Sequence, residues 1–136
     1  MESSLQILIT TYNSEKYIEK LVSHILNTKI NPSLNWEIII GDDASTDNTI
    51  KIIERIKSSS SKVSLITNKQ NSGPLVLRKK MLELASSDYI VFIDSDDDFM
   101  DGFFDCIVDH IGTDIIVTKR IYQFENYCKE YANNYI

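Results

Sequence analysis

Several features are scarce or missing in this chain of 136 residues, and each absence excludes a class of protein. Its two cysteines, Cys106 and Cys128, form no Cys-x-x-Cys pair, which argues against a zinc site or a disulfide framework. No apolar run reaches about 18 residues, and the first residues lack a basic segment followed by an apolar one. We therefore expect a cytoplasmic chain with no transmembrane segment and no secretion signal.

Positive charge is also scarce. The chain has 14 Lys and Arg against 20 Asp and Glu, a formal net charge of −6. Because such a surface repels polyanions, no nucleic-acid partner is expected. A small phosphorylated ligand remains compatible with this charge if a cation bridges it to the protein.

Short apolar runs alternate along the chain with segments of helical periodicity. This alternation predicts an α/β domain with three layers, α/β/α, and a mainly parallel central sheet. The chain 1–136 is interpreted as a single domain, with a core at 1–120 and a helical tail at 121–136. Strands are predicted at 5–9, 36–40, 62–66, 89–93 and 114–118, and helices at 14–26 with Ser14 as its cap, 45–57, 74–85 and 101–110.

The predicted tail is rich in aromatic residues at helical spacing. Phe124, Tyr127, Cys128, Tyr131 and Tyr135 would share one helix face. This face is expected to pack against the sheet or against a second copy of the chain, which would make a homo-oligomer.

The most informative stretch is 89–98, where five β-prone residues lead into Asp94, Asp96, Asp97 and Asp98. Acids this close repel one another, and a cation with oxygen ligands relieves the repulsion. If the strand persists, Asp94 and Asp96 project to the same side and can share Mg²⁺ or Mn²⁺, whereas Asp97 faces away unless the turn has begun. A solvated acidic loop is the alternative that the spacing alone leaves equally open.

Polar clusters follow three of the predicted strands, at 10–13, 42–43 and 94–98. Ligands of parallel sheets bind beyond the carboxyl ends of the strands, so one pocket should collect all three clusters. A carboxylate of the second cluster can accept a hydrogen bond from a nucleobase, and Tyr12 offers a flat ring for stacking. Alternatively, Asp42 and Asp43 only cap the following helix, and Tyr12 only packs in a turn.

Three segments, 7–17, 36–49 and 93–97, carry a resemblance to a known family. In this order and spacing they resemble the nucleotide-binding half of family 2 glycosyltransferases, which have the GT-A fold. The likeness runs from about Leu5 to Asp101. It implies a nucleotide-diphosphate sugar donor, first of all a UDP-sugar, with Mg²⁺ or Mn²⁺ as cofactor. It also implies transfer to a saccharide or lipid-linked acceptor hydroxyl, with inversion at the anomeric carbon.

The resemblance also implies a set of site residues. In the family, the loop after the first strand lines the nucleoside, the aspartate pair serves the base, and the Asp-x-Asp meets ribose and metal-bound diphosphate. The implied donor-binding residues are Thr11, Tyr12, Glu15, Asp42, Asp43, Gly73, Arg78 and Asp94. The implied metal ligands are Asp94, Asp96 and Asp97, with Asp96 as the direct ligand and Asp97 as a helper.

The chain also departs from the family. Lys79 stands where an Asn is expected and Met81 where a Gly is expected, so the third helix should pack or contact the donor differently. The family's general base comes from a region after the Asp-x-Asp that this chain barely enters, so the base is expected outside it. Whether the chain is an enzyme is therefore left open.

Two further readings of the sequence compete with a sugar transferase. The first is a non-catalytic fragment that binds nucleotide sugar. The second is a haloacid-dehalogenase-like phosphatase with Asp94 as nucleophile. Against the phosphatase, Asp98 stands where that family has a hydroxyl residue, and three β-α units precede the motif.

Overall fold

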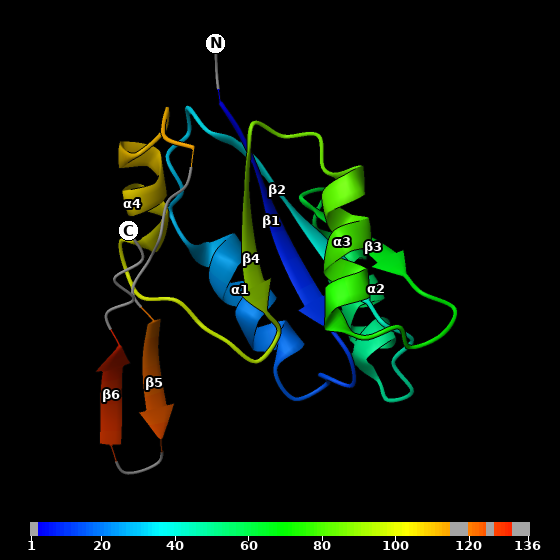
Figure 1. Ribbon diagram of the computed structural model, residues 1–136. Helices are drawn as coiled ribbons and strands as arrows, with labels where there is room; N and C mark the ends of the chain where they lie inside the picture. Colours follow the sequence, from blue (N-terminus) through cyan, green and yellow to red (C-terminus); the bar gives the residue numbers. More distant parts are fainter. Residues whose placement is uncertain (1–2, 115–119, 125–126, 132–136) are drawn as a thin grey trace.

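Figure 1 shows the chain in a computed structural model that describes residues 3–114, 120–124 and 127–131. Four parallel strands form the central sheet in the order β3-β2-β1-β4. The strands are β1 Ser4–Thr11, β2 Asn35–Asp42, β3 Val63–Thr67 and β4 Tyr89–Asp94. The helices are α1 Ile18–Asn27, α2 Thr49–Ser59, α3 Pro74–Leu84 and α4 Phe103–Asp109.

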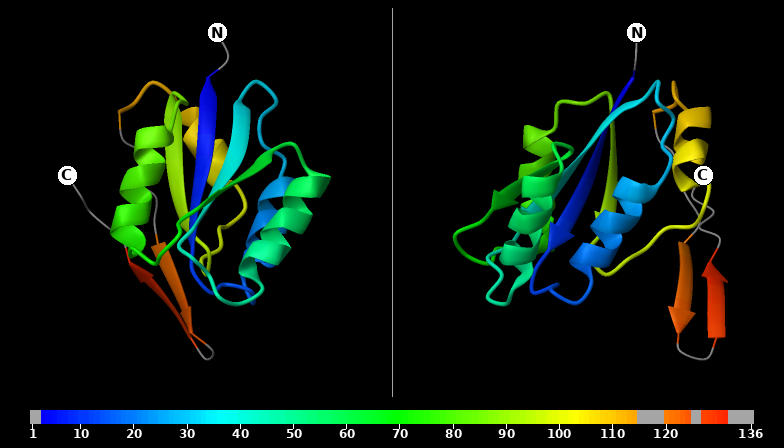
Figure 2. Two further views of the ribbon diagram at one scale, coloured as in Figure 1. Left: turned by 90° about the vertical axis from the view of Figure 1, so that its right-hand side faces the viewer. Right: turned by 180° about the vertical axis from the view of Figure 1, so that it is seen from behind.

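The central strand β1 divides the core into two layers, because successive side chains of a strand point to opposite faces. Leu5, Ile7 and Ile9 are buried in one cluster with residues of α1, α2 and α4. Leu8 packs on the other face against Leu77 of α3. Figure 2 shows α3 on one side of the sheet and α1 with α2 on the other. The predicted three-layer α/β/α fold is confirmed.

The strand register brings the ends of the three central strands to one level. Thr10 pairs with Gly41 of β2 and with Asp94 of β4, and Thr11 pairs with Asp42. The polar residues that follow these strands therefore start from the same edge of the sheet. The predicted convergence of the three clusters depends on this register.

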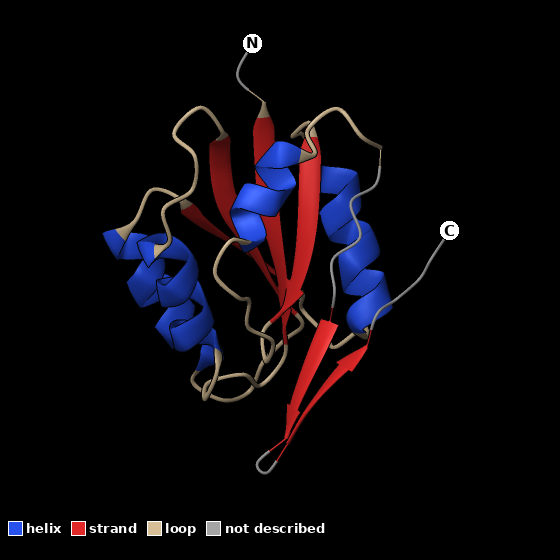
Figure 3. Ribbon diagram, turned by 90° about the vertical axis from the view of Figure 1, so that its left-hand side faces the viewer, coloured by secondary structure: helices blue, strands red, loops and turns tan. Residues whose placement is uncertain are grey.

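The predicted helical tail is wrong where the structure describes it. Arg120–Phe124 (β5) and Tyr127–Tyr131 (β6) form an antiparallel two-stranded sheet, seen in Figure 3. Isoleucine, tyrosine and phenylalanine favour extended backbone, and Tyr122 and Phe124 already show a period of two. The other residues of the tail, and 115–118 of the predicted fifth strand, lie outside the described residues.

The first helix begins later than predicted. Ser14 does not cap it; the Ser14 carbonyl accepts hydrogen bonds from Tyr17 N–H at 2.9 Å and Ile18 N–H at 3.0 Å, which closes a turn before α1. The other predicted helices occur with shifted ends. Within the described residues, no helix combines the length and apolar character that a membrane span requires.

Candidate functional site

A pocket of about 450 Å³ opens where the carboxyl ends of the strands meet. Three segments line it: the end of β1 with the loop before α1, the first turns of α3, and the end of β4 with the turn that follows. The lining residues are Thr10, Tyr12, Asn13, Ser14, Tyr17, Pro74, Arg78, Asp94, Ser95 and Asp96. A second pocket of about 280 Å³ shares Arg78 and Asp94 and adds Phe92 and Asp97.

Asp94 ends β4 on the sheet face that α3 covers. Its Oδ1 accepts a hydrogen bond from Thr10 Oγ1 at 3.1 Å and forms an ion pair with the Arg78 guanidinium. These contacts join β1, β4 and α3 beside the pocket. The Nε of Arg78 is buried without a hydrogen-bond partner in the described part of the chain, so the guanidinium has donor capacity left over.

The turn after β4 presents Asp96 to the pocket. Ser95 N–H donates to the Thr10 carbonyl at 3.3 Å, and Asp97 N–H donates to the Asp94 carbonyl at 2.9 Å. The buried hydroxyls of Ser95 and Ser14 are hydrogen-bonded at 2.7 Å, which fixes the turn to the loop before α1. Asp96 itself is exposed and faces the pocket.

The predicted metal ligands do not form a complete site on their own. Across the described ranges, no three His, Cys, Asp or Glu side chains gather closely enough to hold a metal ion. Asp94 and Asp96 line one pocket, and Asp97 lines the neighbouring one together with Asp94, so the three-carboxylate set stays a prediction. Two carboxylates still suit Mg²⁺ or Mn²⁺, which complete their shells with phosphate oxygens and water.

Asp43 is buried and organises the loop before α3. Its carboxylate accepts hydrogen bonds from the Asn68 side chain at 2.8 Å, from Ser72 N–H at 3.0 Å and from Gly73 N–H at 2.8 Å. Burial raises the pKa of Asp43, but these hydrogen bonds together outweigh it and hold the pKa below its ordinary value. Gly73, at φ 85°, then leads into Pro74, which lines the pocket.

Asp42 is likewise buried, and its carboxylate accepts hydrogen bonds from the N–H and hydroxyl of Ser45. Neither aspartate of the pair caps α2, because Asp47 accepts the Thr49 N–H at the start of that helix. The helix-cap alternative is therefore wrong. Neither Asp42 nor Asp43 lines the pocket, and their contact with a nucleobase stays a prediction.

Thr11 and Glu15 also do not line the pocket. Thr11 is buried, and its hydroxyl has no hydrogen-bond partner in the part of the chain that the structure describes. Glu15 Oε2 accepts hydrogen bonds from the backbone and side-chain N–H groups of Asn48, both at 3.0 Å, and so ties the loop to α2. Glu15 therefore supports the loop that carries Tyr12.

Sequence analysis missed Tyr17. The resemblance does not name it among the site residues, but its side chain is 52% exposed and lines the pocket together with Tyr12, which is 48% exposed. The buried stripe consists of Ile18, Leu21, Val22 and Ile25. Tyr17 lies at the edge of that stripe, where periodicity alone does not separate a buried residue from an exposed one.

These features define an α/β protein with a ligand pocket at the carboxyl ends of a parallel sheet. The sequence matches the profile described as Glycosyl transferase family 2 over residues 6–133, and the chain belongs to this family. Membership in this family argues against the alternative of a haloacid-dehalogenase-like phosphatase.

Known members show how far the likeness extends. The putative teichuronic acid biosynthesis glycosyltransferase TuaG of Bacillus subtilis is 37% identical over 93 residues, which are 68% of this chain and 36% of TuaG. The crystal structure of Staphylococcus aureus TarS in complex with UDP-GlcNAc superposes with a TM-score of 0.69 and 28% identity, covering 78% of this chain and 30% of that one.

A third comparison concerns the fold alone. The mannosyltransferase PcManGT of Pyrobaculum calidifontis, in complex with GDP-Man and Mn²⁺, superposes with a TM-score of 0.70 at 20% identity, covering 84% of this chain and 34% of that one. Its GT-A fold is the fold of this chain. The chain spans about a third of the length of the relatives described here.

Proposed function

We propose that the pocket binds the nucleotide diphosphate of a sugar donor, first of all a UDP-sugar, with a divalent metal. The observation that carries the proposal is that Tyr12 lines one pocket with Asp94 and Asp96, which are distant from it in sequence. A flat ring beside two carboxylates suits a ligand with a base at one end and phosphates at the other. The UDP-GlcNAc in the TarS structure supports a nucleotide sugar as the ligand.

Each residue has a distinct role in this proposal. Tyr12 stacks on the base, and Arg78 donates to phosphate oxygens while it remains close to Asp94. Asp96, with Asp94, holds Mg²⁺ or Mn²⁺, and Asp97 assists from the neighbouring pocket. When bound, the metal neutralises charge on the leaving diphosphate.

We further propose that the family's inverting transfer to a saccharide or lipid-linked hydroxyl uses this donor site. Inversion by direct displacement requires a base that removes the proton of the acceptor hydroxyl. The acids that line the two pockets, counted among the described residues, are Asp94, Asp96 and Asp97, and all three serve the donor. The base is therefore assigned to a region other than these pockets.

Calorimetric titration with UDP, with and without Mn²⁺, tests the donor site. We expect binding that depends on Mn²⁺ and that Asp96→Ala weakens by about 2 kcal/mol, because a charged partner is lost. Asp109→Ala, which removes an exposed acid from α4, is the matched control and should bind like wild type. Equal affinity with and without Mn²⁺ contradicts the metal role, and no binding in either condition contradicts the donor site.

A further inference from the structure

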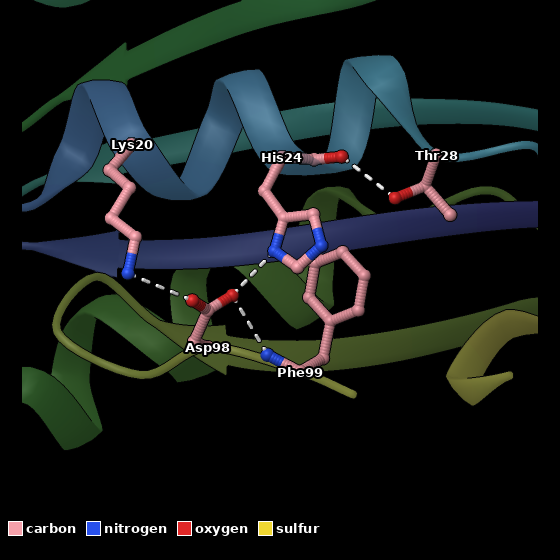
Figure 4. Close-up of polar contacts among 5 residues, drawn as sticks. All are labelled: Lys20, His24, Thr28, Asp98 and Phe99. Atoms are coloured by element: carbon pink, nitrogen blue, oxygen red, sulfur yellow. Dashed lines mark hydrogen bonds and ion pairs between the residues drawn. The ribbon is translucent and has the colours of Figure 1, made fainter. Parts of the chain in front are cut away.

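Asp98, the last acid of the cluster at 94–98, binds α1, as Figure 4 shows. Its Oδ2 lies 3.2 Å from Lys20 Nζ, and its Oδ1 lies 2.6 Å from His24 Nδ1. Because a carboxylate oxygen only accepts, Nδ1 carries the hydrogen of this bond. Asp98 lines neither pocket.

The neighbouring Phe99 strengthens this attachment. Its ring stacks on the His24 imidazole, with the ring centres 4.1 Å apart and the planes at 12°. Its backbone N–H donates to Asp98 Oδ1 at 3.0 Å, and its ring also meets the buried Phe104 edge-on at 5.1 Å. Charge and aromatic packing therefore hold residues 98–99 on one face of α1.

The carboxylate of Asp98 is kept in its charged form by these contacts. Burial raises the pKa of Asp98, but hydrogen bonds from His24, from Phe99 N–H and from Lys20 outweigh this effect and lower the pKa. At the end of α1, the Thr28 hydroxyl donates to the His24 carbonyl at 2.7 Å and ties the residue after the helix to its last turn.

Asp96 thus lies between two anchors. On one side, Ser95 is bound to Ser14 and to the Thr10 carbonyl. On the other side, Asp98 is bound to α1. We propose that Asp98 and His24 are positioning residues, which hold the Asp96 turn in place and so raise affinity for a metal-bound nucleotide without touching it. This inference rests on the proposed donor site.

Titration of UDP with Mn²⁺ separates positioning from direct ligation. We expect Asp98→Asn and His24→Ala each to weaken UDP binding in the presence of Mn²⁺ about three- to tenfold, the size of effect typical of a partly exposed charged contact. The weaker binding of UDP without metal should stay unchanged. The double variant should lose less affinity than the sum of the two single variants, since both remove the contact between Asp98 and His24. Asp98→Glu, which keeps the charge, should lose less affinity for UDP than Asp98→Asn.

The matched control is Glu19→Ala, which breaks another ion pair of α1, the 2.8 Å contact with Arg55. It should leave UDP binding at the wild-type level. Strictly additive losses in the double variant, or a loss with Asp98→Asn and none with His24→Ala, would show that the two residues do not act through their shared contact and would overturn the proposal.

Hydrogen exchange of the ligand-free protein tests the anchor independently of the donor. The backbone amides of 95–101 should exchange several-fold faster in Asp98→Asn and in His24→Ala, and at the wild-type rate in Glu19→Ala. Unchanged exchange in the first two variants overturns the proposal. If wild type fails to bind UDP, the proposed function fails, and exchange still decides whether Asp98 and His24 hold the turn.

Discussion

Asp43 is a single residue on which the geometry of one pocket wall depends. Asp43→Asn replaces one acceptor oxygen with an amide that faces the N–H donors of Ser72 and Gly73. We expect a loss of about 2 kcal/mol in the free energy of unfolding at pH 7, because partly buried hydrogen bonds lose a charged acceptor. Urea denaturation measures this loss, and Asp105→Asn, an exposed acid on α4, is its control.

The pH dependence of this difference follows from the lowered pKa of Asp43. A carboxyl group with a lowered pKa in the folded state stabilises the fold above its unfolded value of about 3.9, and this contribution disappears as pH falls through the folded pKa. The gap between wild type and Asp43→Asn should therefore be full above about pH 5 and shrink below about pH 3.9. If the difference in stability instead stayed constant from above about pH 5 to below about pH 3.9, this would contradict the role of the ionised carboxylate.

Tyr17 and Tyr12 allow a second test at the scale of residues, because both line the pocket and only Tyr12 was predicted to do so. Tyr17→Ala should weaken UDP binding by about 1 kcal/mol if its ring contacts the ligand. Tyr17→Phe keeps the ring and is the control that separates stacking from hydrogen bonding. Calorimetry that finds Tyr17→Ala equal to wild type would restrict the contact to Tyr12.

At the scale of elements, the packing of α3 on the sheet depends on the absence of a side chain at Gly41 of β2. Gly41 of β2 leaves room for Met81, which is 1% exposed; a Cβ at Gly41 would lie 2.5 Å from Met81 Sδ and 3.2 Å from Leu77 Cδ1. Met81 is one of the two departures from the family pattern, and the structure assigns it to the core. Lys79, the other departure, is exposed and lies 4.0 Å from Glu83.

Gly41→Ala should therefore lower the free energy of unfolding by about 1–3 kcal/mol, because it overpacks a filled core. Met81→Ala alone removes a buried side chain and should cost about 2–5 kcal/mol. In the double variant the new methyl group enters the space that Met81 has left, so the loss should be at least about 1 kcal/mol smaller than the sum. Strictly additive losses in urea denaturation would contradict this packing.

The elements also show which parts of the fold follow from sequence pattern. The β1 side chains alternate strictly between two faces and the α1 stripe has clear helical spacing, so their types could be predicted. The tail could not, because Tyr122 and Phe124 fit a period of two while Phe124, Tyr127 and Tyr131 fit a helical spacing. Composition then favours the strands that the structure contains at β5 and β6.

For the whole molecule, the meeting of distant clusters at one edge was predictable, since a parallel sheet places all its carboxyl ends on one side. The roles of neighbouring acids were not predictable in this way. Asp96 faces the pocket while Asp98 binds α1, and the difference arises from a turn whose backbone direction no spacing rule supplies. The same holds for Asp43, whose partners come from a loop about 30 residues away.

Nuclear magnetic resonance titration of the isotope-labelled chain with UDP and Mg²⁺ tests most directly that the ends of β1 and β4 and the start of α3 build one donor site. The account predicts that amide signals of 12–17, 73–78 and 94–97 shift together with one dissociation constant. Signals at the opposite edge of the sheet, such as those of Lys62 and Asp88, should stay in place. Shifts confined to one of the three segments, or centred on the opposite edge, would contradict it.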